Sequence, residues 1–69
     1  MAAAKDVVGF LKRHGFVEKR QTGSHLVLQN PRTKYRTVIP MHSGDLPKGL
    51  LHRILKDAGH SLKDFLREG

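Results

Sequence analysis

The sequence predicts a single α+β domain in which a three-stranded antiparallel sheet carries its helices on one face. Two observations lead to this fold class. Amphipathic helical patterns flank a central stretch, residues 16–39, that has the composition and alternation of strands. Short turn-like segments interrupt that stretch, and strands joined by short turns pair antiparallel. With 69 residues the chain suffices for one domain, 1–69, with a small core.

Residues 5–14 are expected to form the first helix, because apolar side chains recur at helical spacing and charged ones occupy the opposite face. Val7, Phe10 and Leu11 lie on the apolar face. Gly15 is a typical residue just beyond a helix end. His14, in the last turn, is expected to complement the negative end of the helix dipole rather than to act as a ligand or catalyst.

Three strands are expected, over residues 16–21, 25–29 and 34–39. The segments between them, Thr22-Gly23-Ser24 and Asn30-Pro31-Arg32-Thr33, have the composition of tight turns. Because side chains alternate along a strand, Leu26 and Leu28 share one face of the second strand and His25 lies on the other. If the leucines pack under the helices, His25 lies on the open face of the sheet.

The third strand leaves two arrangements open. Either Arg36 and Val38 face the core, or Tyr35, Thr37 and Ile39 do. Both sets contain an apolar side chain and a polar one, so alternation does not decide between them.

Residues 41–46 are expected to form a loop, and residues 47–58 a second helix with Pro47 at its first position. The apolar stripe of this helix consists of Leu50, Leu51, Ile54, Leu55 and Ala58. Ser61 and Asp64 have the spacing of a capping box, which predicts a short third helix through residue 66 that docks Phe65. The order helix, three strands, helix, short helix is that of the double-stranded-RNA-binding-like folds.

The charge of the chain is its strongest global signal. Thirteen Lys and Arg against six Asp and Glu leave a net charge of +7, which attracts polyanions such as nucleic acid or an acidic protein. No membrane partner is expected, because no helix pairs a cationic face with aromatic anchors. The N-terminus lacks the pattern of a signal peptide or a membrane span, so a cytoplasmic protein is expected. There is no cysteine to form a disulfide or a thiolate metal site.

The candidate for chemistry is His25, because it directly follows a turn and is expected on the open face of the sheet. The five histidines, at positions 14, 25, 42, 52 and 60, do not have the spacing of a zinc site, so neither a metal nor a cofactor is expected. RNA cleavage needs little more than a proton carrier and cations, since the ribose 2′-hydroxyl can itself attack the adjacent phosphate. The turn residues Gly23 and Ser24 offer backbone N–H groups that, like cations, can stabilise the negative charge on the phosphate.

Basic side chains are expected to hold the RNA backbone, and those on the second helix form a cationic ridge. The candidate RNA-binding residues are Lys19, Arg20, Lys34, Arg36, Lys48, His52, Arg53 and Lys56.

The chain resembles the HicA-type toxins of toxin–antitoxin pairs over nearly its whole length. The resemblance runs through Gly15-Phe16, Gly23-Ser24-His25, Val38-Ile39-Pro40-Met41-His42, Lys48-Gly49-Leu50-Leu51, Ile54-Leu55-Lys56-Asp57-Ala58-Gly59 and Phe65. It implies a double-stranded-RNA-binding-like fold, a translation-independent mRNA endonuclease activity and a HicB-type antitoxin that covers the active site.

The same resemblance implies that His25 is the catalytic histidine and that Gly23 and Ser24 shape its turn. His42 matches the family's Pro-x-His segment and is either structural or a second proton carrier. Leu50 stands where the family often has threonine, so one phosphate contact or part of a helix cap is lost there.

Two other functions remain open from the residues themselves. The chain could be a non-catalytic RNA-binding module in which His25 contacts a phosphate or a base. It could also be a basic interaction domain whose ligand is an acidic protein. Replacement of His25 by alanine separates them, because only a nuclease has cleavage to lose.

Overall fold

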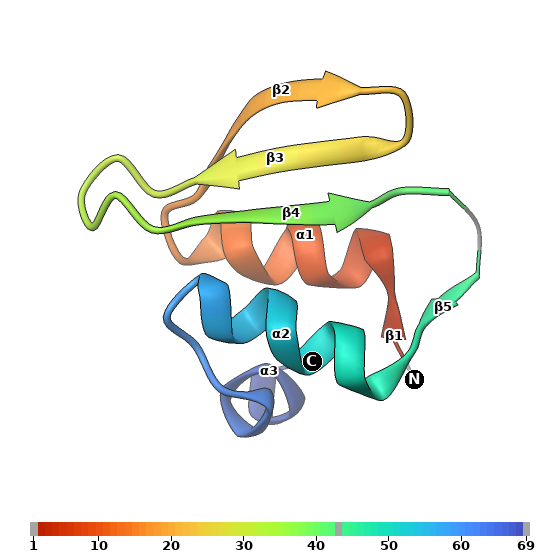
Figure 1. Ribbon diagram of the computed structural model, residues 1–69. Helices are drawn as coiled ribbons and strands as arrows, with labels where there is room; N and C mark the ends of the chain where they lie inside the picture. Colours follow the sequence, from red (N-terminus) through yellow and green to blue (C-terminus); the bar gives the residue numbers. More distant parts are fainter. Residues whose placement is uncertain (1, 43, 69) are drawn as a thin grey trace.

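The computed structural model describes residues 2–42 and 44–68, which form a sheet with helices packed on one of its faces (Figure 1). Helix α1 (Ala4–Arg13) is followed by strands β2 (Val17–Thr22), β3 (His25–Gln29) and β4 (Arg36–Pro40). Helices α2 (Lys48–Asp57) and α3 (Leu62–Glu68) follow. The predicted α+β class and the predicted order of these six elements are confirmed.

Strand β3 is the centre of the three-stranded sheet, with β2 and β4 antiparallel on either side. Thr22 pairs with His25, so Gly23 and Ser24 alone form the hairpin loop. Gly23 has φ +59°, the positive value that a glycine at the first position of a two-residue hairpin supplies without strain. The predicted turn is therefore confirmed, and it fixes the register of the hairpin.

The third predicted strand begins two residues later than expected. Lys34 has φ +70°, which is incompatible with strand geometry, so β4 starts at Arg36. Within β4, Thr37 and Ile39 are buried and Arg36 and Val38 are exposed, which resolves the arrangement that alternation left open. Tyr35, which precedes the strand, is 52% exposed and is not a core residue.

The core lies between the inner face of the sheet and helices α1 and α2. Its fully buried side chains include Val7, Phe10 and Leu11 from α1, Leu28 and Ile39 from the sheet, and Leu51 and Leu55 from α2. Leu50 departs from the expected apolar stripe of α2, because it is 37% exposed and points to the edge of the sheet. The helix therefore buries a narrower stripe than its sequence predicts.

A two-stranded antiparallel pairing of β1 (Ala2–Ala3) with β5 (Asp45–Leu46) was not expected. These segments are too short to show any periodicity, and they pair because Ala2 and Leu46 are both buried at the edge of the core. Part of the predicted loop 41–46 is thus a strand. Pro47 lies just before α2 rather than within it, and its carbonyl accepts a hydrogen bond from the Leu51 N–H at 2.9 Å.

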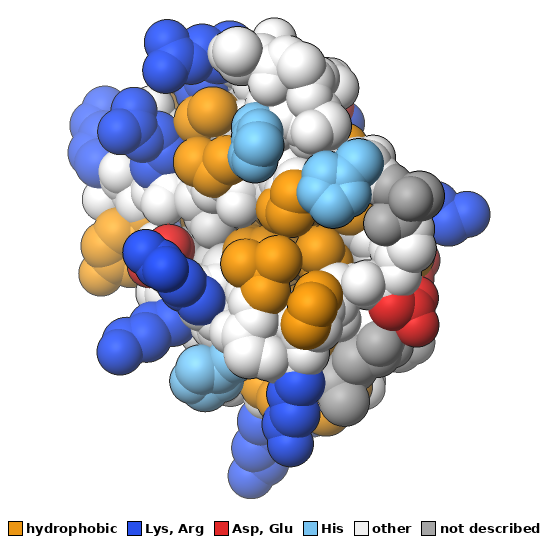
Figure 2. Space-filling model, turned by 45° about the vertical axis from the view of Figure 1, so that its right-hand side comes forward, with side chains coloured by type: hydrophobic (Ala, Val, Ile, Leu, Met, Phe, Trp, Pro, Cys, Tyr) orange, Lys and Arg blue, Asp and Glu red, His pale blue; other side chains and the backbone are white. Residues whose placement is uncertain are grey.

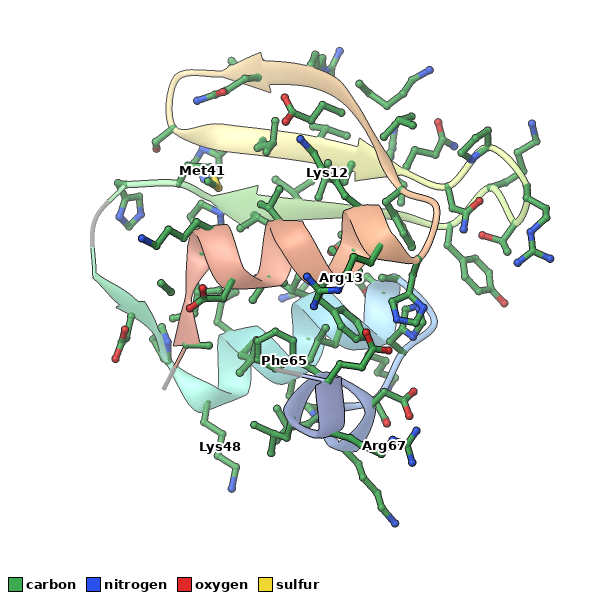
Figure 3. All side chains as sticks on the ribbon, turned by 180° about the vertical axis from the view of Figure 1, so that it is seen from behind. Lys12, Arg13, Met41, Lys48, Phe65 and Arg67 are labelled. Carbon is green, nitrogen blue, oxygen red and sulfur yellow. The ribbon has the colours of Figure 1, made fainter. Side chains whose placement is uncertain are left out.

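Helix α3 packs against α1 and α2, and lies below α1 in the view of Figure 3. Phe65 meets Phe10 edge to face, with ring centroids 5.4 Å apart, which confirms the expected docking. The capping box is also present: the Asp64 N–H donates to Ser61 Oγ at 3.0 Å and the Ser61 N–H donates to Asp64 Oδ2 at 3.4 Å. No helix among the described residues is long and apolar enough to cross a membrane.

Candidate active site

His25 is the first residue of the central strand, and its side chain lies on the face of the sheet opposite the helices. Its cross-strand neighbours are Thr22 on β2 and Pro40 on β4. The imidazole is exposed and makes no hydrogen bond or ion pair with the described residues. A histidine on a rigid strand, open to solvent and without an internal partner, is free to exchange protons with a ligand.

The turn before His25 is held in place by its neighbours. The carbonyl of Ser24 accepts a hydrogen bond from the Met41 N–H at 2.5 Å, which extends the β3–β4 pairing beyond the strand ends. The amide Nε2 of Gln21 donates to the carbonyl of Gly23 at 3.1 Å. These bonds fix the backbone on both sides of the loop and so limit where the imidazole can lie.

A groove of about 660 Å³ lies between β4 and α2 and includes His25 at one end. It is lined by His25, Arg36, Thr37, Val38, Pro40, Leu50, Arg53, Ile54 and Asp57. Two of the predicted RNA-binding residues, Arg36 and Arg53, therefore share a concave surface with the predicted catalytic histidine. They come from different elements, one from the edge strand and one from the helix beside it.

The other predicted RNA-binding residues are exposed but do not line this groove: Lys19, Arg20, Lys34, Lys48, His52 and Lys56. Arg20 pairs with Val27 and so lies on the same sheet face as His25. On α2, the four-residue spacing carries Lys48, His52 and Lys56 along one side of the helix, roughly 150° around its axis from the residues that line the groove. The predicted ridge is thus divided, since Arg53 alone of its members faces the groove.

His42 and Gly49 do not join the groove either. His42 is exposed in the loop after β4 and is absent from the groove lining, so a shared proton-transfer role with His25 gains no support from this placement. Gly49 has open space around the position of a Cβ. Leu50 does line the groove, so the residue that stands where the family often has threonine is part of the site.

Six residues of the groove were not among the candidate site residues: Thr37, Val38, Pro40, Leu50, Ile54 and Asp57. Val38 was one of two open assignments and Leu50 was expected in the core. Asp57 follows Arg53 by one helical turn, and this spacing was the signal that could have found it. Figure 2 shows hydrophobic side chains gathered on the face near the end of β4 and the start of α2, with histidines beside them and Lys and Arg around the border.

The family model described as the HicA toxin of bacterial toxin–antitoxin matches residues 4–60. The chain belongs to the HicA toxin family. The match spans α1 to α2 and so contains every residue of the groove. No protein among those with curated functions matches the chain significantly.

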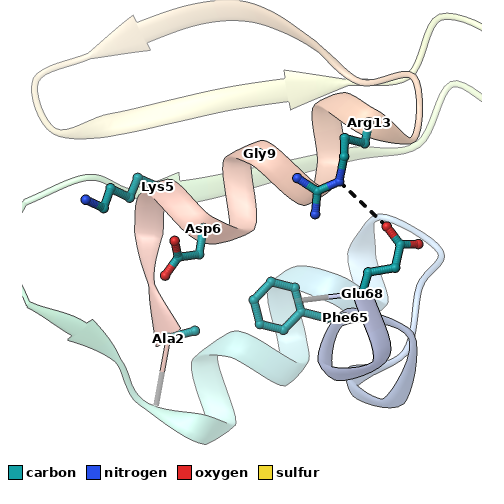
Figure 4. A pocket seen from close by; sticks show the side chains of 7 residues that line it. All are labelled: Ala2, Lys5, Asp6, Gly9, Arg13, Phe65 and Glu68. Carbon is teal, nitrogen blue, oxygen red and sulfur yellow. Dashed lines mark ion pairs between the residues drawn. The ribbon is translucent and has the colours of Figure 1, made fainter.

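Helix α3 lies beyond the part of the chain that matches the HicA model, and a second cavity of about 480 Å³ opens where it meets α1 (Figure 4). Phe65 forms part of its wall, and Arg13 reaches Glu68 across it, with Nε and Oε1 3.7 Å apart. None of the candidate site residues lines this cavity. Of these two cavities, only the groove between β4 and α2 contains candidate site residues.

The described residues bring no group of three or more His, Asp or Glu side chains together in an arrangement that could hold a metal ion. The groove of this HicA-family chain offers instead an imidazole, two guanidinium groups and one carboxylate.

Proposed function

We propose that this HicA-family toxin is a metal-independent endoribonuclease that cleaves single-stranded mRNA in the cytoplasm and so blocks translation. The observation that carries the proposal is that His25 lines the same groove as Arg36 and Arg53. An imidazole that shares a groove with guanidinium groups can supply the proton transfer and the charge stabilisation that metal-independent phosphodiester cleavage uses.

The reaction begins at the ribose 2′-hydroxyl of the RNA. Its oxygen forms a bond to the adjacent phosphorus while the bond from phosphorus to the 5′-oxygen of the next nucleotide breaks. One proton leaves the 2′-hydroxyl and one reaches the departing 5′-oxygen, so a 2′,3′-cyclic phosphate and a 5′-hydroxyl result. His25 carries one of these protons, and water exchanges the other.

Arg36 and Arg53 hold the phosphate and offset the charge that develops on its oxygens. Guanidinium groups suit this role, because their planar donors match two phosphate oxygens at once. The exposed cations outside the groove attract the RNA strand electrostatically, because the net charge of +7 acts at long range. Arg20 is one of them and lies on the same sheet face as His25.

The partner that restrains the toxin is, in this proposal, a HicB-type antitoxin protein that covers the groove. Val38 and Leu50 are 44% and 37% exposed there, and a protein partner would bury them together with His25.

The decisive experiment incubates the purified protein with labelled single-stranded RNA in EDTA. Wild type is compared with His25→Ala and with His52→Ala, a matched loss of an exposed imidazole outside the groove. We expect wild type to cleave, with cyclic-phosphate ends, and His25→Ala to bind but not cleave. His52→Ala loses one candidate RNA-binding side chain, so it should still cleave and at most bind the RNA less tightly. Binding without cleavage by all three proteins would replace the nuclease by a non-catalytic RNA-binding module.

A further inference from the structure

The groove has two features that phosphate cleavage does not need. The first is its apolar lining, which Val38, Pro40 and Leu50 contribute alongside the charged groups. Val38 and Leu50 remain 44% and 37% exposed. Phosphate groups gain nothing from such side chains, whereas the flat face of an unpaired nucleobase does. The volume of about 660 Å³ lies within the range of sites that enclose small organic groups.

The second feature is the carboxylate of Asp57. This side chain is exposed, lines the groove, and makes no ion pair or hydrogen bond with the other described residues. A negative charge in a groove that receives a polyanion opposes phosphate binding. A ligand group that donates hydrogen bonds would offset this charge, because a carboxylate only accepts them.

Helix stability does not account for Asp57. It is the last residue of α2, where the helix dipole disfavours a negative charge. It follows Arg53 by four residues, which is the less favourable order for a helical ion pair, and the two side chains form none. The carboxylate of Asp57 therefore contributes little to the stability of the fold.

We propose that the groove between β4 and α2 holds one unpaired base of the RNA beside the scissile phosphate, and that Asp57 selects guanine at this subsite. The inference rests on the proposed ribonuclease function for the position of the cleaved bond. Among the four bases, guanine alone presents two adjacent donors, N1–H and the 2-amino group, which match the two oxygens of a carboxylate. Adenine, cytosine and uracil each offer a single donor group on that edge.

The test uses DNA strands that contain one ribonucleotide, so that each strand has one cleavable bond. The base of the ribonucleotide and the base after it are varied independently through all four bases. We expect guanine at one of these two positions to raise kcat/KM at least about tenfold over the other bases, as a paired two-donor contact does. Inosine, which lacks the 2-amino group, should lose most of the gain, and 7-deazaguanine should keep it.

Asp57→Asn is the test variant, and Asp6→Asn is its control. Asp6 accepts a hydrogen bond from the Ala3 N–H at 3.3 Å, which an asparagine oxygen can replace, and it lies outside the groove. We expect the kcat/KM values of Asp57→Asn for the four bases to lie within about threefold of one another, while Asp6→Asn keeps the preference for guanine. Thermal melting of Asp57→Asn should match or exceed that of wild type, because the charge opposes the helix dipole.

Binding of the same strands without any ribonucleotide separates the two proposals. If guanine is preferred in binding through Asp57 and the strands that contain a ribonucleotide are not cleaved, the guanine subsite is supported and the proposed nuclease activity is rejected. Cleavage of all strands at equal rates, with equal affinities, keeps the nuclease and overturns the guanine subsite. A preference that survives in Asp57→Asn also overturns it.

Discussion

The hydroxyl of Thr37 donates a hydrogen bond to the carbonyl oxygen of Ile54 at 2.9 Å, and so joins strand β4 to the middle of helix α2. Both residues line the groove that contains His25. The same carbonyl also accepts the Ala58 N–H of the helix at 3.2 Å. This buried contact sets the distance between the two walls of the candidate active site.

Thr37→Val removes that hydrogen bond and keeps the shape of the side chain. We expect a loss of about 1 kcal/mol in the free energy of unfolding, because Ile54 retains its helical donor and is not left unpaired. Urea denaturation measures the loss. Thr22→Val, on the exposed strand β2, should change stability by less than about 0.5 kcal/mol. Equal stabilities for the two variants would show that the Thr37 contact contributes nothing.

Arg36→Ala and Arg53→Ala should each lower kcat/KM for RNA by about tenfold or more, since each removes a charged donor to phosphate. Lys63→Ala, which removes one positive charge from α3, is the matched control and should cleave as wild type does. For a strand without ribonucleotides, each arginine variant should also reduce the salt dependence of binding by about 0.7 in the logarithmic slope. A loss of the same size in Lys63→Ala would mean that overall charge, not the groove, holds the strand.

Gly59→Ala should destabilise the fold for two separate reasons. Gly59 has φ +81°, and a Cβ there would lie 2.5 Å from two carbons of the Tyr35 ring. Gly44→Ala is the control, because Gly44 has φ +86° and no described atom within 4 Å of that position. We expect each to cost about 1–2 kcal/mol in backbone strain, and Gly59→Ala to cost more. Adding Tyr35→Ala should recover the steric part, so additive losses in the double variant would contradict this account.

The stability of the chain should fall at acid pH partly through Asp64. The hydrogen bond from the Ser61 backbone N–H is the main cause that lowers the pKa of Asp64 below the ordinary value of 3.8, with the Ser61 hydroxyl and Arg67 adding to it. Because the folded-state pKa is the lower one, the unfolded chain binds more protons between the two values. This contribution to stability is complete above about pH 5 and is lost as pH falls through the folded-state pKa.

Asp64→Asn should therefore flatten the decline in the free energy of unfolding between about pH 5 and pH 2, measured by urea denaturation at each pH. Ser61→Ala keeps the backbone N–H and loses only the hydroxyl, so it should flatten the decline less. Parallel pH curves for wild type and Asp64→Asn would exclude this role for the capping box.

Much of the fold follows from short-range patterns. The helical repeat of Val7, Phe10 and Leu11 and the alternation around Leu26 and Leu28 act within a few residues, and the structure has these side chains in the core. The same alternation put His25 on the open face, where it lies. These predictions succeeded because each depends on the geometry of one element.

The groove could be anticipated only in part. His25, Arg36 and Arg53 were all candidates, but nothing in their spacing showed that they share one surface while Lys48, His52 and Lys56 do not. Asp57 was not a candidate, although its spacing of four residues from Arg53 puts both on one side of α2. His14 was assigned to the helix dipole, whereas its Nε2 also lies 2.5 Å from Oε2 of Glu68, 54 residues away in the chain.

The sequence by itself determined the helices, the strands of the main sheet, the hairpin turn and the side of the sheet on which His25 lies, because local backbone geometry and side-chain periodicity fix them. Only the tertiary structure decided which face of β4 is buried, that Leu50 leaves the core, and that Arg36, Arg53 and Asp57 line one groove with His25. Those outcomes depend on how α2 packs along the edge of the sheet. That packing is set by contacts such as Thr37 with Ile54, between residues far apart in the chain.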